Sequence, residues 1–238
     1  EQVVDAPHRR IALGVERIFL LLLHANDPKT PLEDSLGALA ALQREGKIEH
    51  LGLSNTGIAE VRQAERHFPV RAIQNELSVM DRHSAVDGLV ALAGQLGIPF
   101  LAHRPLGGHA KTGNLLKNRA VKPLTTRHQV SPHEAALAAL LDLGPPVLPL
   151  VGATKRTSVE SSLRALSVRL DERDRADLKS KITFTPTPEA LALGAPPTTP
   201  PGLRALAADE GPSDGPEVVV MMGIQGAGKS SEVARYLE

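Results

Sequence analysis

The chain has 238 residues and a formal net charge of zero at pH 7, because 27 Lys and Arg balance 27 Asp and Glu. Zero cysteines exclude disulfides and thiolate–metal sites, and the charge balance argues against a nucleic-acid-binding surface. No apolar run reaches the roughly 18 residues that a membrane span needs, and the first residues lack the basic-then-apolar order of a signal peptide. We therefore expect a cytoplasmic protein with no membrane contact.

Short apolar runs alternate along the chain with longer segments of helical period, which is typical of a parallel sheet with crossover helices. The predicted strands cover residues 17–23, 49–54, 70–74, 99–102 and 147–151. The predicted helices cover residues 31–46, 57–67, 84–96 and 131–143, with one or two more up to residue 182. The first strand contains the uninterrupted apolar run IFLLLL at 18–23, so we expect it to be buried on both faces.

Local signals refine two of these assignments. Ser131 and Glu134 are spaced as a capping box, with Pro132 at the first helical position, and predict a helix start. The segment 107–130 is polar and contains glycine, so it is interpreted as a long loop or lid. Five strand–helix units are too few for a closed eight-stranded barrel and also suit an open doubly wound sheet, and spacing does not separate these two α/β folds.

The composition changes after residue 184. Residues 185–215 are rich in proline and predict a mobile linker, with an extended tail on the preceding domain as the alternative. An apolar strand is then expected over residues 217–222.

A glycine-rich motif follows that strand and has the spacing of a phosphate-binding loop before a helix. Backbone N–H groups of such a loop surround phosphates, while Lys229 would reach the β- and γ-phosphates of ATP and Ser230 would bind Mg²⁺. The candidate ATP-binding residues are Gly223, Gly226, Gly228, Lys229, Ser230 and Ser231. The motif resembles that of small kinases acting on nucleotides or polynucleotide ends, so nucleic acid stays possible as a partner of this end alone.

The order of motifs in residues 10–182 resembles the aldo-keto reductase family from its fourth barrel strand onward. The motifs are LLLLH ending at residue 24, LQREGKI at 42–48, LGLSN at 51–55, IQNE at 73–76, RPLG at 104–107 and VGAT at 151–154. The resemblance implies a partial (β/α)₈ barrel of strands four to eight. It also implies reduction of a small carbonyl substrate with NADP(H).

The same resemblance assigns roles to individual residues. His24 corresponds to the catalytic histidine that orients the carbonyl oxygen, and Ser54, Asn55 and Gln74 correspond to the clamp on the nicotinamide carboxamide. His103 stands where many relatives carry an aromatic residue that stacks on the nicotinamide.

The remaining cofactor-binding candidates belong to the phosphate and adenosine end. The resemblance implies backbone contacts to the pyrophosphate from Pro105 and Leu106, and a cofactor-holding segment that opens at Gly152. Lys155 or Arg156 would meet a 2′-phosphate and select NADPH over NADH. Relatives then carry an acidic residue and an asparagine that grip the adenine, where this chain has Ser161 and Ser162.

The family's acid tyrosine, aspartate and lysine lie on earlier strands, and the one tyrosine of this chain is Tyr236. Since residue 1 is not Met, we expect a piece of a longer fusion, with a reductase-like domain at 1–184, a linker at 185–215 and the start of a kinase domain at 216–238. Carbonyl reduction by the 238-residue chain is expected to be weak. The alternative is a non-catalytic barrel that serves as scaffold or regulator of the kinase, and open sheet edges would favour self-association.

Overall fold

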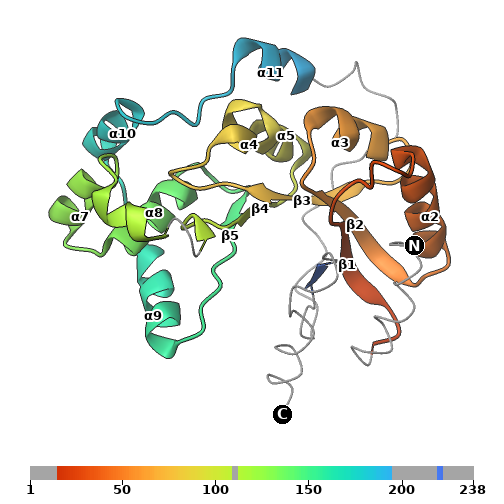
Figure 1. Cartoon of the computed structure of the whole chain (residues 1–238), viewed down its shortest axis with the longest axis horizontal. Helices are drawn as coiled ribbons and strands as arrows, with labels where there is room; N and C mark the ends of the chain where they lie inside the picture. Colours follow the sequence, from red (N-terminus) through yellow and green to blue (C-terminus); the bar gives the residue numbers. More distant parts are fainter. Residues whose placement is uncertain (1–14, 109–111, 195–218, 222–238) are drawn as a thin grey trace.

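The computed structural model describes residues 15–108, 112–194 and 219–221. Its centre is one parallel sheet with the strand order β5-β4-β3-β2-β1-β6 (Figure 1). The strands are β1 Ile18–Leu23, β2 Ile48–Ser54, β3 Val70–Glu76, β4 Phe100–His103, β5 Val147–Pro149 and β6 Val219–Met221. All six predicted strands are confirmed, although β5 and β6 are shorter than expected.

The strand order decides between the two α/β folds that the sequence left open. Strands β1 to β5 lie side by side in the order in which they occur in the chain. A doubly wound sheet reverses its strand order at a switch point, whereas a barrel adds each new strand to the same side. The chain therefore contributes five consecutive strands of the barrel type.

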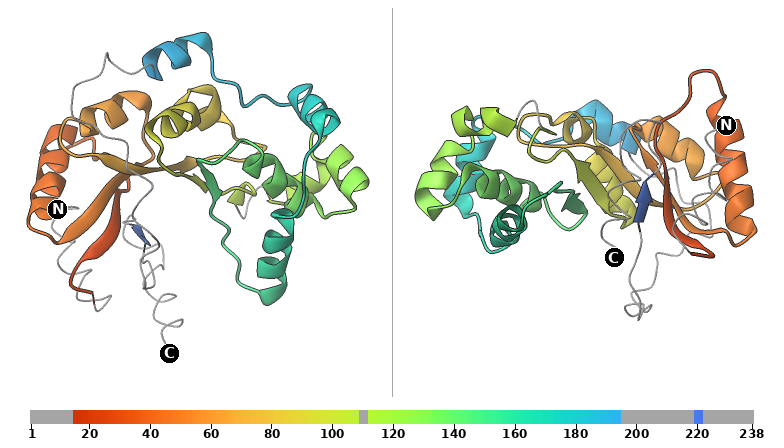
Figure 2. Two further views of the ribbon diagram at one scale, coloured as in Figure 1. Left: turned by 180° about the vertical axis from the view of Figure 1, so that it is seen from behind. Right: turned by 60° about the horizontal axis from the view of Figure 1, so that its bottom comes forward.

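Helices cover the outer side of the curved sheet, as the two views in Figure 2 show for α2, α3 and α5. The helices that flank the strands are α2 Leu32–Arg44, α3 Ile58–Ala64, α4 His83–Val86, α5 Leu89–Leu96, α8 Pro132–Leu141, α9 Arg156–Ala165 and α10 Glu172–Lys179. The capping box predicted for α8 is confirmed, because the Ser131 hydroxyl accepts from the Glu134 N–H and the Glu134 carboxylate accepts from the Ser131 N–H.

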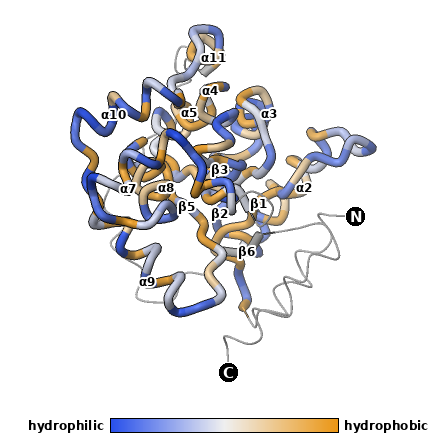
Figure 3. The backbone as a smooth tube through the Cα atoms, turned by 60° about the vertical axis from the view of Figure 1, so that its left-hand side comes forward, coloured by the Kyte–Doolittle hydropathy of each residue, from blue (hydrophilic) through white to orange (hydrophobic). Residues whose placement is uncertain are grey.

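Strand β1 is buried on both faces, as its apolar run predicted. Leu21 and Leu23 belong to the main core between the sheet and the helices, while Leu20 and Leu22 join a smaller cluster on the opposite face. Figure 3 shows hydrophobic residues gathered along the central strands, with hydrophilic residues prominent in outer elements such as α10.

The prediction of one continuous helix over residues 84–96 is wrong. Two helices, α4 and α5, replace it, and Gly88 between them has a φ of +82°. That left-handed conformation stops a helix and is readily adopted by glycine. Ala190 lies against Gly88, so a side chain at this position would also meet a neighbouring helix.

The long loop predicted over residues 107–130 is also wrong. The segment contains the 3₁₀ helix η1 Thr112–Lys117 and the helix α7 Lys122–His128. Leu115 and Leu124 are completely buried in a second cluster with α8 and α10. Polar residues dominate this segment, so its few apolar anchors give a weak helical period.

Part of the predicted linker is ordered. Residues Pro188–Gly194 form the short helix α11, which packs against α5 and buries Ala190. The mobile linker is therefore wrong for this segment, where a helix lies on the preceding domain. Residues 195–215 lie outside the described part of the chain. Across the described residues, no helix is long and apolar enough to cross a membrane.

Gly52 in β2 makes room for close packing on the inner face of the sheet. A Cβ atom at this position would contact the Leu22 side chain and approach the Ala72 carbonyl oxygen to 2.5 Å. Because neither β1 nor β3 can move away without breaking the ladder, Gly52→Ala is expected to reduce the free energy of unfolding by about 1–3 kcal/mol. Urea unfolding measures this value.

Gly37→Ala is the matched control for Gly52→Ala. Gly37 lies inside α2, and apart from its chain neighbours and the backbone of its own helix no atom lies within 4 Å of an added Cβ, so alanine is expected to raise stability by about 0.4–1 kcal/mol. Equal effects of the two substitutions would contradict the packing described for β2.

Candidate functional site

Polar side chains meet where strands β1, β2 and β3 end. Parallel strands present their carboxyl ends at the same edge of a sheet. His24 follows β1 directly, Ser54 is the last residue of β2, and Gln74 lies two residues before the end of β3. The Ser54 hydroxyl donates to the Gln74 side-chain oxygen at 3.1 Å, and both residues are buried. The structure thus brings together side chains that are distant in sequence.

Asn55 connects this cluster to β1. Its side-chain amide donates to the His24 backbone oxygen at 2.7 Å and to the Ser54 hydroxyl at 3.3 Å. Its own backbone N–H donates to the Gln74 carbonyl at 3.0 Å. Asn55 has a φ of +50°, a conformation that asparagine tolerates better than most residues. We name His24, Ser54, Asn55 and Gln74 the strand-end cluster.

A second asparagine supports the strand-end cluster and was missed at the level of sequence. Asn75 accepts from the Thr56 N–H at 3.0 Å and donates to the Thr56 carbonyl at 2.8 Å. These two bonds fix the chain immediately after Asn55 against the end of β3. The only signal was an asparagine in a strand next to Gln74, and that is too common to interpret.

The end of β4 carries the next candidates. His103 is paired in register with Glu76 of β3, so it lies one strand further along the same edge. Arg104 follows with a φ of +50° and an Nη1–Oε2 distance of 3.5 Å to Glu76. The chain then turns, with the Gly107 N–H donating to the Arg104 carbonyl at 2.7 Å.

Within that turn, the two predicted pyrophosphate contacts have different surroundings. Pro105 is buried, and Leu106 packs against the second hydrophobic cluster. Their side chains therefore serve the fold, which leaves backbone groups for any contact with a ligand.

The residues predicted to bind the adenosine end of the cofactor follow β5, the strand that pairs with β4. Gly152, Lys155 and Arg156 are exposed there, and Arg156 begins α9. The Arg156 guanidinium pairs with Glu160 one helical turn later, at an Nε–Oε1 distance of 2.8 Å. These residues are separate from the strand-end cluster, so the structure places the candidates in two groups along one edge.

Ser161 and Ser162 occupy the positions where the resemblance implies an adenine grip. The Ser161 hydroxyl donates to Glu134 of α8 at 2.9 Å, and the Ser162 hydroxyl donates to the Ser158 carbonyl at 2.8 Å. Both hydroxyls are therefore engaged within the protein.

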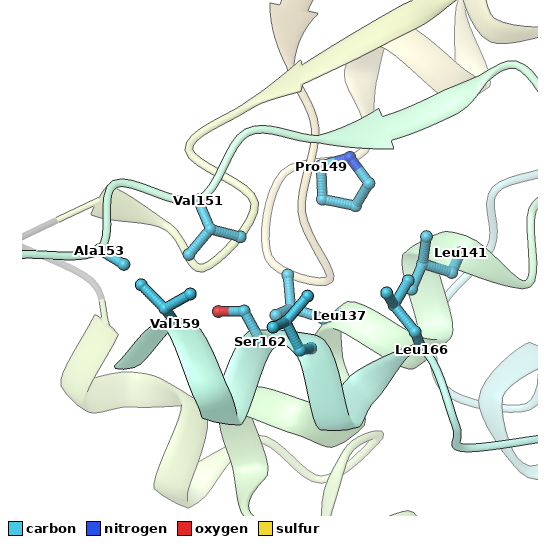
Figure 4. A pocket seen from close by; sticks show the side chains of 9 residues that line it. Leu137, Leu141, Pro149, Val151, Ala153, Val159, Ser162 and Leu166 are labelled. Atoms are coloured by element: carbon cyan, nitrogen blue, oxygen red, sulfur yellow. The ribbon is translucent and has the colours of Figure 1, made fainter. Parts of the chain in front are cut away.

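An apolar cavity of about 250 Å³ lies between α8, β5 and α9 (Figure 4). It is lined by Leu137, Leu141, Pro149, Val151, Ala153, Val159, Ser162, Leu163 and Leu166. Within the described ranges, His, Asp and Glu residues form no group that could hold a metal ion. The candidate ATP-binding residues 223–231, including the Mg²⁺ candidate Ser230, lie outside the described residues.

Residues 8–183 match the model of the aldo/keto reductase family. The chain belongs to this family. It is 34% identical over 168 residues to an uncharacterized oxidoreductase of Schizosaccharomyces pombe, covering 70% of this chain and 53% of the relative. It is 31% identical over 192 residues to a probable aldo-keto reductase 1 of Glycine max, covering 70% of this chain and 55% of the relative. The chain thus spans about half the length of these relatives.

Solved structures agree on the fold. A thermostable aldo-keto reductase in complex with epalrestat has a TM-score of 0.67 at 24% identity, covering 75% of this chain and 65% of its own. An aldo-keto reductase of Klebsiella pneumoniae in complex with NADPH has a TM-score of 0.66 at 21% identity, covering 77% of this chain and 64% of its own. The aldo-keto reductase barrel is therefore the fold of the described domain, with five of its strands in this chain.

The strained Asn55 gives a test of the strand-end cluster. Asn55→Ala is expected to lower the free energy of unfolding by about 2 kcal/mol, because it loses the bond to the His24 carbonyl and leaves alanine in a left-handed conformation. Asn55→Gly also loses the bond, but glycine adopts the left-handed conformation without strain, so the free energy of unfolding should fall by only about 1 kcal/mol. Chemical unfolding of both variants would show this order, and equal costs would contradict the strain at this position.

Proposed function

We propose that the chain is the cofactor-binding part of an NADP(H)-dependent oxidoreductase that acts on a small carbonyl compound. The observation that carries the proposal is the hydrogen-bonded cluster of Ser54, Asn55 and Gln74 at the carboxyl edge of a barrel sheet. Family membership and two Klebsiella pneumoniae relatives, whose structures contain NADPH or NADP, support it.

The chemistry of the cluster fits a nicotinamide carboxamide. That group offers one carbonyl acceptor and one NH₂ donor, and it needs complementary partners to fix which ring face is presented. Ser54, Asn55 and Gln74 supply a hydroxyl and two amides, which are held by bonds to each other and to the backbone. Such fixed groups lose little freedom when a ligand binds.

NADPH, when bound, supplies the hydride for reduction of a carbonyl group. The role of His24 in this proposal is to donate a hydrogen bond to the carbonyl oxygen and orient it, and the end of β1 is a suitable place. The family's acid is a tyrosine on an earlier strand. General acid catalysis contributes about 10²–10⁴-fold, so we expect slow turnover by the 238-residue chain.

We propose that Lys155 and Arg156 bind the 2′-phosphate of NADPH, so that the chain binds NADPH more tightly than NADH. Both side chains are exposed at the start of α9. Because the Arg156 guanidinium already forms an ion pair with Glu160, we expect Lys155 to make the main contact with the 2′-phosphate.

Gln74→Met tests the proposal, because methionine keeps the volume of the buried side chain and removes its hydrogen-bonding groups. We expect saturable NADPH binding by the unaltered chain and at least about tenfold weaker binding by the variant, measured by calorimetry. NADH should bind the unaltered chain more weakly than NADPH does.

Gln63→Met is the control for this substitution. Gln63 lies on α3 and donates to Glu33, well away from the strand-end cluster, so its variant should bind NADPH normally. Unchanged NADPH affinity in Gln74→Met would refute the carboxamide clamp.

A second proposal concerns the glycine-rich segment, where we infer binding of MgATP as the start of a kinase domain. Its support is the motif at 223–230 and the strand β6, which directly precedes it and pairs in parallel with β1. A strand before the glycines is the context that a phosphate-binding loop requires. If the segment belongs to a kinase, the alternative to a catalytic barrel is a non-catalytic barrel that serves as a scaffold or regulator of that kinase.

Lys229→Ala is expected to abolish ATP binding at this segment, because the lysine supplies the positive charge for the β- and γ-phosphates. Binding of a fluorescent ATP analogue in the presence of Mg²⁺ provides the measurement, and Lys179→Ala on α10 is a control cation outside the motif. ATP affinity that is equal in the unaltered chain and in Lys229→Ala would remove the phosphate-loop proposal and leave the NADP(H) proposal intact.

We further propose a cytoplasmic location, nucleic acid as a partner of the kinase end only, and self-association through the sheet edges at β5 and β6.

A further inference from the structure

Helix α9 carries the proposed 2′-phosphate residues but has little apolar anchoring. Ala165 is its one buried residue, whereas Val159 and Leu163 are 46% and 58% exposed. By contrast, α8 is buried at seven of its ten positions. Apolar burial therefore contributes less to the position of α9 than to that of α8, and a polar interaction adds to it.

That interaction comes from Glu134 of α8, a carboxylate that is only 5% exposed. Its Oε1 atom accepts from the Ser161 hydroxyl at 2.9 Å and from Arg164 Nε at 2.8 Å. Its Oε2 atom accepts from the Ser131 N–H at 2.8 Å. One carboxylate therefore caps α8 and grips α9 at two positions.

The surroundings keep Glu134 ionised. Burial by itself would raise the pKa of the carboxyl, but the hydrogen bonds from Ser131, Ser161 and Arg164 together hold the pKa below its usual value. An ionised oxygen can accept two hydrogen bonds at once, and charge-assisted bonds are stronger than neutral ones.

We propose that Glu134 is a positioning residue that fixes α9 and thereby places Lys155 and Arg156 for the 2′-phosphate end of the cofactor. The inference rests on the proposed NADP(H) function. Ser161 lies five residues beyond Arg156, which is about 7.5 Å along a helix. Ser161 and Arg164 are the sixth and ninth of the ten residues of α9, so the two bonds hold its second half. Because so short a helix moves as a rigid rod, fixing that half limits how far the first turn can tilt or slide.

The same contact gives Ser161 a structural role at a position where the resemblance implies an adenine grip. Ser161 is turned toward α8, so its contribution to cofactor binding is indirect. Removing Glu134 should affect α9 far more than α8, because α8 keeps its apolar packing and its Ser131 cap.

Glu134→Gln is the test variant, since glutamine has the same shape but loses the charge and cannot replace both oxygens as acceptors. Asp142→Asn is the matched control. Asp142 is the C-cap residue of the same helix and accepts two bonds from Arg175 of α10, so it also forms a carboxylate–guanidinium contact between helices, but with α10 as the partner.

Two readouts on the full 238-residue chain separate positioning from general destabilisation. Hydrogen exchange of the α9 amides should be faster in Glu134→Gln and unchanged in Asp142→Asn. Calorimetry should show about three- to tenfold weaker binding of adenosine 2′,5′-bisphosphate in Glu134→Gln, with nicotinamide mononucleotide binding unchanged. Arg164→Gln should resemble Glu134→Gln, and the double variant should add little.

Equal weakening of both probes, unchanged exchange in α9, or the same effect in Asp142→Asn would overturn the inference. Failure of the unaltered chain to bind either probe would overturn the proposed function, and the ligand part of the inference with it. Probe binding that Glu134→Gln leaves unchanged would overturn the inference alone.

Discussion

The parallel pairing of five consecutive strands is the constraint on which the rest of the structure depends. It places every strand end at one edge of the sheet, so residues that are distant in sequence become hydrogen-bonded neighbours, as Ser54 and Gln74 do across β2 and β3 and Asn55 and His24 do across β2 and β1. The pairing in turn depends on close packing on the inner face, where Gly52 leaves space for Leu22. The position of a site at this edge therefore depends on the pairing of the strands more than on any single residue.

Short polar bonds convert this placement into fixed geometry. The Asn55 amide joins the ends of β1 and β2, and Asn75 joins the chain after β2 to β3. Bonds of this type restrict side chains that would otherwise rotate freely after a strand ends. The left-handed conformation of Asn55 is maintained because its backbone and its side chain are both held by neighbouring strands.

Sequence predicted the features that depend on local pattern and on recognised motifs. The strands, the Ser131 capping box and the strand-end candidates belong to this class, because apolar runs and cap spacing act within a few residues. It missed features that depend on distant partners. The break at Gly88 is packed against Ala190, about one hundred residues later, and the helix α7 is fixed by burial of Leu124 against α8 and α10. The role of Glu134 toward α9 was hidden for the same reason: its spacing to Ser131 indicated a cap, and nothing local indicated Ser161 or Arg164 as partners.

The outer helices are attached in two physically different ways, and this difference bears on function. Helices α2 and α5 are held by apolar side chains that enter the main core, such as Leu36 and Leu92, and burial of this kind tolerates small shifts without a specific geometry. Helix α9 buries little apolar surface and is also held by directional bonds to one carboxylate, which favour one orientation and weaken when the partners move apart. A helix end that must meet a phosphate is better served by the second arrangement, because charge recognition depends on distance and angle more than on buried area. The polar attachment of α9 therefore suits the cofactor-binding role proposed for its first turn.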